Sequence, residues 1–405
     1  MTVAAAPTLR ANRDYVLLWL GQTLSLVGSA LGWVAYPLLV LSLTGSAAKA
    51  GIVTFANWIP YVIFQLPAGA LVDRWNRKAT MVVCDALRAA ALGSIAVTLP
   101  LGHLTLAQII VVAFVERTLT IFFSPAEAAA LTRIVPPEQL SDAVARNDAR
   151  EHTASLLGPP LGGVLFGVAR FLPVAVDAAS YFISLASVVA LRTPFAAEPV
   201  AGRPRLRAEV VEGIRFIWRI PFLRASALQA MGTNVAWTAM TLSMIVVARR
   251  HGASGSEVGV MLALLGVGGL LGTAVSGLIL RRVPPPVLVI GSVWYWGGLA
   301  ALLVTTANPF LLGSIAGALW LIGPAWNGAV GGLRLRLTPD RLQGRVHAVE
   351  SLLSFAARPF GLLATGYLLD GIGGRATLGL IAGWMLAIAF VSTLSPSLRR
   401  LPTIA

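Results

Sequence analysis

Four charged residues, Asp73, Arg74, Arg77 and Lys78, fall within six positions of the segment 69–78, which lies between two long apolar runs. A carboxylate beside three cations can form ion pairs, contact lipid phosphates or accept hydrogen bonds from the N-terminus of a helix. Such a dense charged segment at the end of an apolar run predicts a short hairpin that controls contacts between helices.

Three further ionisable residues, Glu116, Arg117 and Asp177, lie inside apolar runs, where a charge is costly and is therefore a candidate for function. Glu116 is our first choice for a proton carrier, because a carboxylate removed from water can hold a proton near neutral pH. Adjacent side chains point about 100° apart on a helix, so Glu116 and Arg117 cannot both face a cavity squarely. The alternatives are a mutually neutralised Glu116–Arg117 pair, and an Asp177 that only caps or ties helices.

The composition excludes a water-soluble protein, since 57% of the 405 residues are hydrophobic, 12% are charged and the mean hydropathy is +0.78. The apolar runs are continuous over about 20 residues and do not alternate, which predicts membrane-spanning helices and not a β-barrel. The net charge of +14 would suggest nucleic acid in a soluble protein. Here the positions of the cations in short loops report topology, so we expect no nucleic-acid partner.

Cysteine and histidine usage argues against redox and metal chemistry. Cys84 is the only cysteine, which excludes an intrachain disulfide, and the four histidines have no metal-ligand spacing. The sequence has no nucleotide-binding loop and no nucleophile with a base. We therefore expect no metal, no cofactor and no enzymatic activity.

Twelve apolar runs predict twelve transmembrane helices. They lie near 15–43, 48–72, 79–100, 104–130, 153–170, 171–192, 222–248, 257–280, 286–307, 309–333, 348–369 and 373–395. Lys and Arg are concentrated in alternate loops, so we expect both termini in the cytoplasm and the chain as a multi-pass protein of the plasma (inner) membrane.

The longest polar interval, 193–221, reads as a cytoplasmic linker with an amphipathic surface helix over 206–220. It separates an N-terminal bundle, 1–192, from a C-terminal bundle, 222–405. The two halves echo each other at an offset of 208 residues, where Gly69-x-x-x-Asp73 corresponds to Gly277-x-x-x-Arg281. The predicted fold is all-α, with two pseudo-symmetric six-helix bundles and a substrate site between them.

The pattern Gly-x-x-x-Asp-Arg-x-x-Arg-Lys over 69–78, together with the twelve spans and the linker, resembles the major facilitator superfamily of transporters. Within it the chain is most similar to the macrolide-efflux branch of drug:proton antiporters, which also includes siderophore exporters. The other matching segments are 19–26, 123–126, 135–140, 176–178 and 344–346. The resemblance implies the major facilitator fold and alternating access.

For the hairpin, the resemblance implies a conformational latch. Gly69 opens the motif, and the Asp73 carboxylate would accept hydrogen bonds from the start of the eleventh helix near 347–351. Arg77 would then pair with Glu127 at the end of the fourth helix. The alternative is that Arg74, Arg77 and Lys78 only anchor the loop to lipid phosphates.

The fifth helix contains Gly158, Pro159, Gly162 and Gly163, which resemble the Gly-Pro-x-x-Gly-Gly motif of antiporters that favours export. Its alternative is a generic packing face, because glycine permits close approach and proline bends a helix. Glu116 departs from the family pattern, since relatives usually carry Arg at this position. That departure leaves the roles of Glu116 and Arg117 open.

Polar and aromatic residues in helices expected to line the cavity are candidates for contact with substrate. They are Gln22, Tyr36, Arg117, Gln229, Asn234, Trp237, Asn327 and Arg358. The function predicted is proton-coupled export of an amphipathic small molecule by a monomer in the lipid bilayer, with the small molecule and protons as partners. The alternatives are an uncoupled facilitator or uptake carrier, and a membrane sensor or scaffold that does not transport.

Overall fold

The computed structural model describes residues 8–195 and 206–399, and within these ranges every regular element is helical. Eleven helical segments are long and apolar enough to cross a membrane. The helix α5 (Leu140–Val168) is not among them, because its first half is charged and its second half is rich in Gly and Pro. With α5, the helices occupy all twelve predicted spans, and the all-α membrane fold is confirmed.

The helices form two compact units, of residues 1–36 with 63–204 and of residues 37–62 with 205–405. The helices α1 (Arg13–Thr44) and α2 (Ala47–Val72) each run from one unit into the other. They are joined by Gly45 and Ser46, and Gly45 adopts a φ of 66°, which favours glycine. The bundle boundaries predicted at 192 and 222 stay a prediction, and part of the predicted linker, 196–205, lies outside the described residues.

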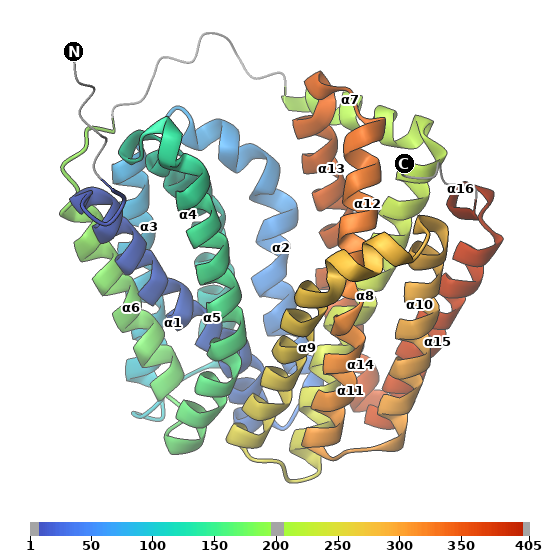
Figure 1. Cartoon of the computed structure of the whole chain (residues 1–405). Helices are drawn as coiled ribbons and strands as arrows, with labels where there is room; N and C mark the ends of the chain where they lie inside the picture. The colour runs from blue at the N-terminus through green and yellow to red at the C-terminus, as the bar shows by residue number, and fades with distance from the viewer. Residues whose placement is uncertain (1–7, 196–205, 400–405) are drawn as a thin grey trace. The chain divides into compact units, whose positions relative to one another are not determined.

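In the first unit, α3 (Arg77–Thr98) packs against both α4 (Leu106–Ile134) and α6 (Leu172–Val189), while α5 also contacts α6 (Figure 1). Asn76 and Thr105 cap α3 and α4, because their side chains accept hydrogen bonds from the backbone of the first turn. A short turn, η1 (Pro137–Gln139), precedes α5.

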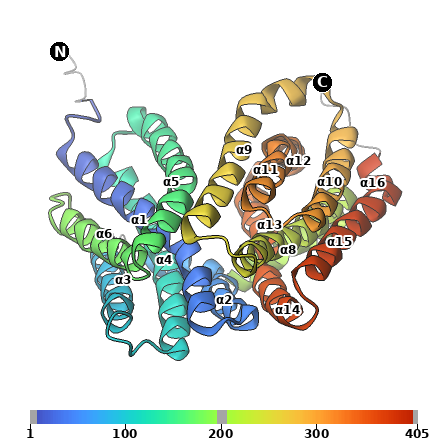
Figure 2. The same ribbon diagram turned by 90° about the horizontal axis from the view of Figure 1, so that it is seen from below.

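The second unit contains the remaining helices, of which α9 packs along α11 and α12, and α15 packs along α8 and α10 (Figure 2). Their bounds are α7 (Leu206–Arg219), α8 (Pro221–Arg250), α9 (Gly255–Arg282), α10 (Pro285–Leu302), η2 (Leu303–Thr305), α11 (Pro309–Leu321), α12 (Gly323–Leu337), η3 (Asp340–Leu342), α13 (Gln343–Ala356), α14 (Arg358–Gly371), α15 (Gly374–Leu394) and α16 (Pro396–Arg399). The helix α7 occupies the stretch predicted to be amphipathic.

Two predicted spans each consist of two helical segments that meet at one residue, whose backbone stays in the helical region. The run 309–333 contains α11 and α12, which are separated at Ile322, and the run 348–369 contains parts of α13 and α14, separated at Ala357. Pro324 and Pro359 lie in the first turn of the second segment, where a missing N–H is tolerated but the preceding helix cannot be continued normally.

The start of the fifth helix was also placed too late by the sequence. The run 153–170 marks only its apolar part, whereas α5 begins at Leu140. The residues 140–152 are polar but remain helical, since hydropathy reports burial in lipid and not helix formation.

Candidate functional site

The charged hairpin follows directly from the end of α2 and the start of α3. Asn76 accepts a hydrogen bond from the Ala79 amide at 3.0 Å, and the Lys78 ammonium donates to the carbonyls of Val189 and Leu191 at the end of α6, at 2.9 and 2.7 Å. Trp75 stacks on Phe122 of α4 with 5.7 Å between ring centroids. The hairpin is therefore fastened to α4 and α6.

Asp73 and Arg74 are exposed at the tip of this hairpin, and the Gly69 backbone has open space around it. A cluster of buried apolar residues, which includes Val72, Met81 and Phe123, lies directly beneath. The exposed Asp73 carboxylate is thus presented by a fixed support, as a latch would require.

Glu127 at the end of α4 pairs with Arg150 of α5, with 3.0 Å between Nη2 and Oε1. Arg150 is buried, so this ion pair is partly shielded from water. The pairing of Glu127 with Arg77 stays a prediction. Arg150 precedes the predicted span 153–170 and lies in the polar first part of α5, so the apolar run gives no sign of this pair.

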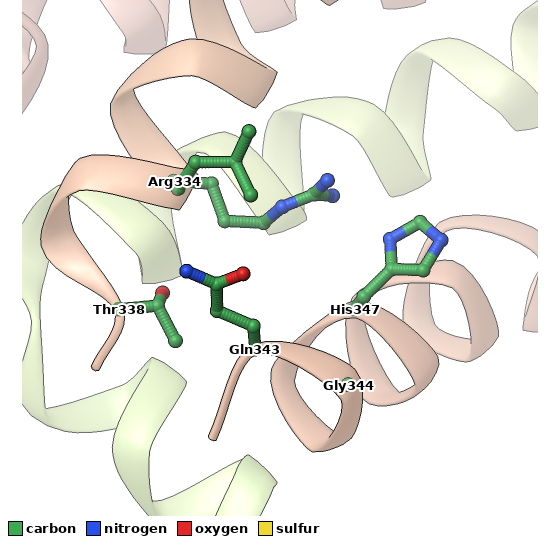
Figure 3. A pocket seen from close by; sticks show the side chains of 6 residues that line it. Arg334, Thr338, Gln343, Gly344 and His347 are labelled. Carbon is green, nitrogen blue, oxygen red and sulfur yellow. The ribbon is translucent and has the colours of Figure 1, made fainter. Parts of the chain in front are cut away.

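A cavity of about 280 Å³ lies at the start of α13, within the second unit (Figure 3). The resemblance assigns Asp73 to this helix. The lining of the cavity includes Arg334, Thr338, Gln343 and His347. The Thr338 hydroxyl is buried and has no hydrogen-bond partner among the described residues. No side chain caps the first turn of α13, and the Gln343 amide donates to the Asp340 carbonyl of η3.

The charge in this cavity is partly balanced. Arg334 pairs with Glu350 at 2.5 Å, and Gln343 donates to Asp340 at 3.0 Å. The Arg334 guanidinium and the Thr338 hydroxyl are donors that suit a carboxylate. The cavity therefore has the chemistry that the predicted latch needs on its receiving side.

The two proton-coupling candidates, Glu116 and Asp177, are brought together in the first unit. The Tyr36 hydroxyl of α1 donates to Glu116 Oε2 at 2.6 Å. Asp177 of α6 is 1% exposed, and its charge interacts with that of Glu116. Asp177 packs against α1 at Gly28, which has no side chain. A Cβ added at Gly28 would lie 2.9 Å from one carboxylate oxygen of Asp177.

A second buried network joins α1, α3 and α6. Gln22 donates to the Ser184 hydroxyl at 2.6 Å, and Ser184 donates to Asp85 at 2.5 Å. Arg88 pairs with Asp85 at 3.2 Å, and its guanidinium lies 4.6 Å from the ring centroid of Tyr181. Gln22, predicted to line the cavity, is buried in this network.

The glycines of the export-like motif mediate contact between α5 and α1. A Cβ at Gly162 would lie 2.8 Å from the carbonyl oxygen of Leu31, and one at Gly158 would overlap Ala30. Pro159 lies inside α5, which remains one helix, and Gly163 is buried beside Gly162. The motif thus lets the backbones of α5 and α1 approach closely, as expected for the alternative of a packing face.

The remaining candidates lie in the second unit, apart from Arg117, which is half-buried in α4. Arg358, in the first turn of α14, donates to Asn234 of α8 and lies 5.0 Å from the ring centroid of Trp58. Gln229 donates to Ser392 at 2.9 Å and is buried. Trp237 packs against Trp296 and Trp320, and Asn327 is exposed.

A model of the Major Facilitator Superfamily matches residues 18–333 of the chain. The chain belongs to the Major Facilitator Superfamily. It is therefore a multi-pass membrane transporter, as the hairpin and the twelve spans predicted.

Its relatives in this superfamily include efflux pumps. The chain is 28% identical over 411 residues to the multidrug efflux pump Tap of Mycobacterium tuberculosis, with 96% of each protein covered. It is 24% identical over 395 residues to the macrolide efflux protein A of Streptococcus pyogenes, with coverage of 96% and 97%. The resemblance to the drug-efflux branch is confirmed.

Solved structures agree on the fold. The nucleoside transporter NupG superposes with a TM-score of 0.74 at 12% identity, covering 95% of this chain and 99% of NupG. A bacterial homologue of the human lysosomal transporter Spinster gives a TM-score of 0.71 at 16% identity, with coverage of 96% and 99%. At these identities the likeness establishes the major facilitator fold alone.

Proposed function

We propose that this transporter exports amphipathic small molecules in exchange for protons by alternating access. Two related proteins are named as multidrug and macrolide efflux pumps, which supports export and a small-molecule substrate. The observations that support the coupling are the Tyr36–Glu116 hydrogen bond and the electrostatic interaction of Glu116 with the buried Asp177, a second intramembrane carboxylate.

The chemistry at this site is the binding and release of one proton. When the site is open to the outside, a proton from water forms an O–H bond on one of the two carboxylates, which removes their mutual repulsion. When it is open to the inside, that O–H bond breaks and the proton passes to water. Tyr36 keeps the Glu116 oxygen in place during both steps.

The Asp73 hairpin and the cavity at α13 complete the proposal as a latch. In the predicted topology both lie on the cytoplasmic face, where both termini also lie. The carboxylate of Asp73 would enter the cavity lined by Arg334 and Thr338 when that face is closed. The protein would act in this way as a monomer in the plasma membrane.

Reconstitution in liposomes tests this proposal against the alternatives. Transport of a fluorescent amphipathic dye that requires an imposed pH gradient supports antiport. Flux that ignores the gradient would favour an uncoupled carrier. The absence of flux over a wide panel of compounds would favour a sensor or scaffold.

The coupling residue is tested by Glu116→Gln, which keeps the shape of the side chain but cannot take up and release a proton. We expect transport driven by the pH gradient to fall at least tenfold, while dye binding to the purified protein is retained. Glu138→Gln is the matched control, since Glu138 is exposed in η1. If Glu116→Gln leaves the pH dependence of transport unchanged, Glu116 has no part in coupling.

A further inference from the structure

The carboxylate of Asp370, at the end of α14, lies on the N-terminus of α2. It accepts hydrogen bonds from the Ser46 hydroxyl at 2.7 Å and from the amides of Ala47 and Ala48 at 3.0 and 2.8 Å. The residues belong to one compact unit, although they are more than 300 positions apart in sequence. Asp370 thus supplies a charge to the positive end of a helix dipole on another helix.

Arg250, at the end of α8, holds the same carboxylate. Its guanidinium pairs with Asp370 at 2.5 Å and also donates to the Leu369 carbonyl at 2.7 Å. Three helices therefore meet at one acid. We call Asp370, Arg250, Ser46 and the amides of Ala47 and Ala48 the outer clasp, because α2 begins here and reaches the charged hairpin 26 residues later, at the opposite face.

Directly beside the outer clasp, α2 and α14 touch backbone to backbone. A Cβ at Gly366 would lie 2.7 Å from the Ala47 carbonyl oxygen and 3.0 Å from Gly51 Cα. Four residues after Gly51 and six residues before Gly366, Phe55 and Phe360 pack edge to face with 5.8 Å between centroids. The contact is therefore a continuous seam of small and then aromatic residues.

The helix α2 does not need Asp370 in order to begin. The Ser46 hydroxyl also accepts a hydrogen bond from the Lys49 amide at 3.2 Å, as a conventional N-cap does. Asp370 is thus an additional partner supplied by another helix. Loss of this partner leaves α2 with a cap of its own, so the contact can break without unwinding the helix.

The chain path makes this contact important for transport. Residues 37–62 pack with the second unit, whereas the preceding part of α1 and the following part of α2 belong to the first unit. In the predicted two-bundle organisation, α2 belongs to the N-terminal bundle, 1–192, and α14 to the C-terminal bundle, 222–405. Bundles that swing apart on one face must separate the helices that are joined there, and the outer clasp and its seam join α2 to α14.

We propose that Asp370 controls the conformational equilibrium of the transporter: the outer clasp holds the outer face closed, and release of substrate to the outside requires it to break. The inference rests on the alternating access of the proposed function and not on proton coupling. It also relates the two ends of the same helix pair. The resemblance assigns Asp73 of α2 to the start of the eleventh helix, and the structure assigns Asp370, at the end of that helix, to the start of α2.

The test is the rate at which a membrane-impermeant maleimide labels a cysteine placed in the closed region. Ala50→Cys is suitable, because Ala50 of α2 is fully buried, and the parent protein, whose only thiol is the buried Cys84, gives the background. The labelling rate reports the open population even when that population is small. The protein is studied in nanodiscs without substrate or pH gradient, so the result is independent of the coupling experiment with Glu116→Gln.

Two substitutions weaken the outer clasp in different ways. Asp370→Asn removes the charge, and Gly366→Ala wedges the seam while improving helix propensity. Asp370→Asn should raise the labelling rate about tenfold, as expected for loss of a charge-assisted contact, and Gly366→Ala should also raise it, because the added Cβ forces α2 from α14. Asp370→Glu should restore a rate closer to that of the parent.

Matched controls separate this role from general destabilisation. Glu257→Gln removes an acid whose bonds go to Ser254 at the start of its own helix, and Gly379→Ala adds a methyl group where nothing lies within 4 Å. Neither should change the rate. If Asp370→Asn and Gly366→Ala label no faster than the parent, or only lower the melting temperature, Asp370 is a structural cap and the proposal is overturned.

Discussion

The buried network of the first unit allows a quantitative prediction for Ser184→Ala. This change deletes a hydroxyl that donates to Asp85 at 2.5 Å and accepts from Gln22 at 2.6 Å. A hydrogen bond to a charged group contributes about 1.5–3 kcal/mol in water-soluble proteins and a neutral one about 0.5–1.5 kcal/mol. Hydrogen bonds within membranes average only about 0.6 kcal/mol, and alanine regains about 0.5 kcal/mol of helix propensity.

The burial of the site decides between these values. Asp85 is fully buried and already bound to Arg88, so no water can replace the lost hydroxyl. We therefore expect Ser184→Ala to lower the free energy of unfolding by about 2 kcal/mol, near the upper end of the membrane range. Most of this loss arises from the charge left with fewer donors.

Ser187→Ala on the same helix is the control, because the Ser187 hydroxyl donates only to the local Ser184 carbonyl, at 2.7 Å. Its cost should stay below about 1 kcal/mol. Unfolding free energies can be measured by steric trapping in bicelles, with Gln22→Ala added to close a double-mutant cycle. Equal losses for Ser184→Ala and Ser187→Ala would refute the argument that the bond to Asp85 dominates.

Two further substitutions test packing and the latch. Gly268→Ala should destabilise the fold by about 1–3 kcal/mol, because a Cβ there would overlap the Gly317 carbonyl and force α9 from α11. Gly277→Ala is the control, because there is open space around Gly277, and it should be neutral or slightly stabilising. Both are measured by thermal unfolding. Thr338→Val removes a buried hydroxyl that has no partner among the described residues, so stability should be unchanged or higher, while dye turnover should change if the cavity receives Asp73. Unchanged turnover would remove Thr338 from the latch.

The membrane spans could be predicted from the sequence because hydropathy over about 20 residues reports burial in lipid directly. The junctions at Ile322 and Ala357 could not. Pro37 and Pro125 lie inside continuous helices, so a proline in an apolar run does not by itself specify a break. Whether the freed carbonyls find other partners depends on neighbouring helices, and these are not visible in a local window.

Whether a candidate site residue could be predicted from the sequence depends on how unusual its residue type is at its position. Glu116 and Asp177 could be proposed as candidates from the sequence, because a carboxylate in an apolar run is costly wherever its partners lie. Asp370 could not, because an acid at the end of a helix is ordinary, and only its contact with Ser46, Ala47 and Ala48 distinguishes it. Its one available signal was the Ser46 N-cap at the start of α2, which indicates a helix N-terminus but names no partner.

The same reasoning explains why glycines carry much of the missing information. Asp177 can lie against α1 only because Gly28 and Gly32 leave space for its two carboxylate oxygens, and Gly366 permits the seam beside Asp370 in the same way. A glycine in a membrane helix indicates that something approaches closely, but not what approaches it. Pairing each glycine with the polar group or backbone that it admits is therefore the step that requires the structure, and it relates separate candidate residues to the proposed coupling site and the proposed clasp.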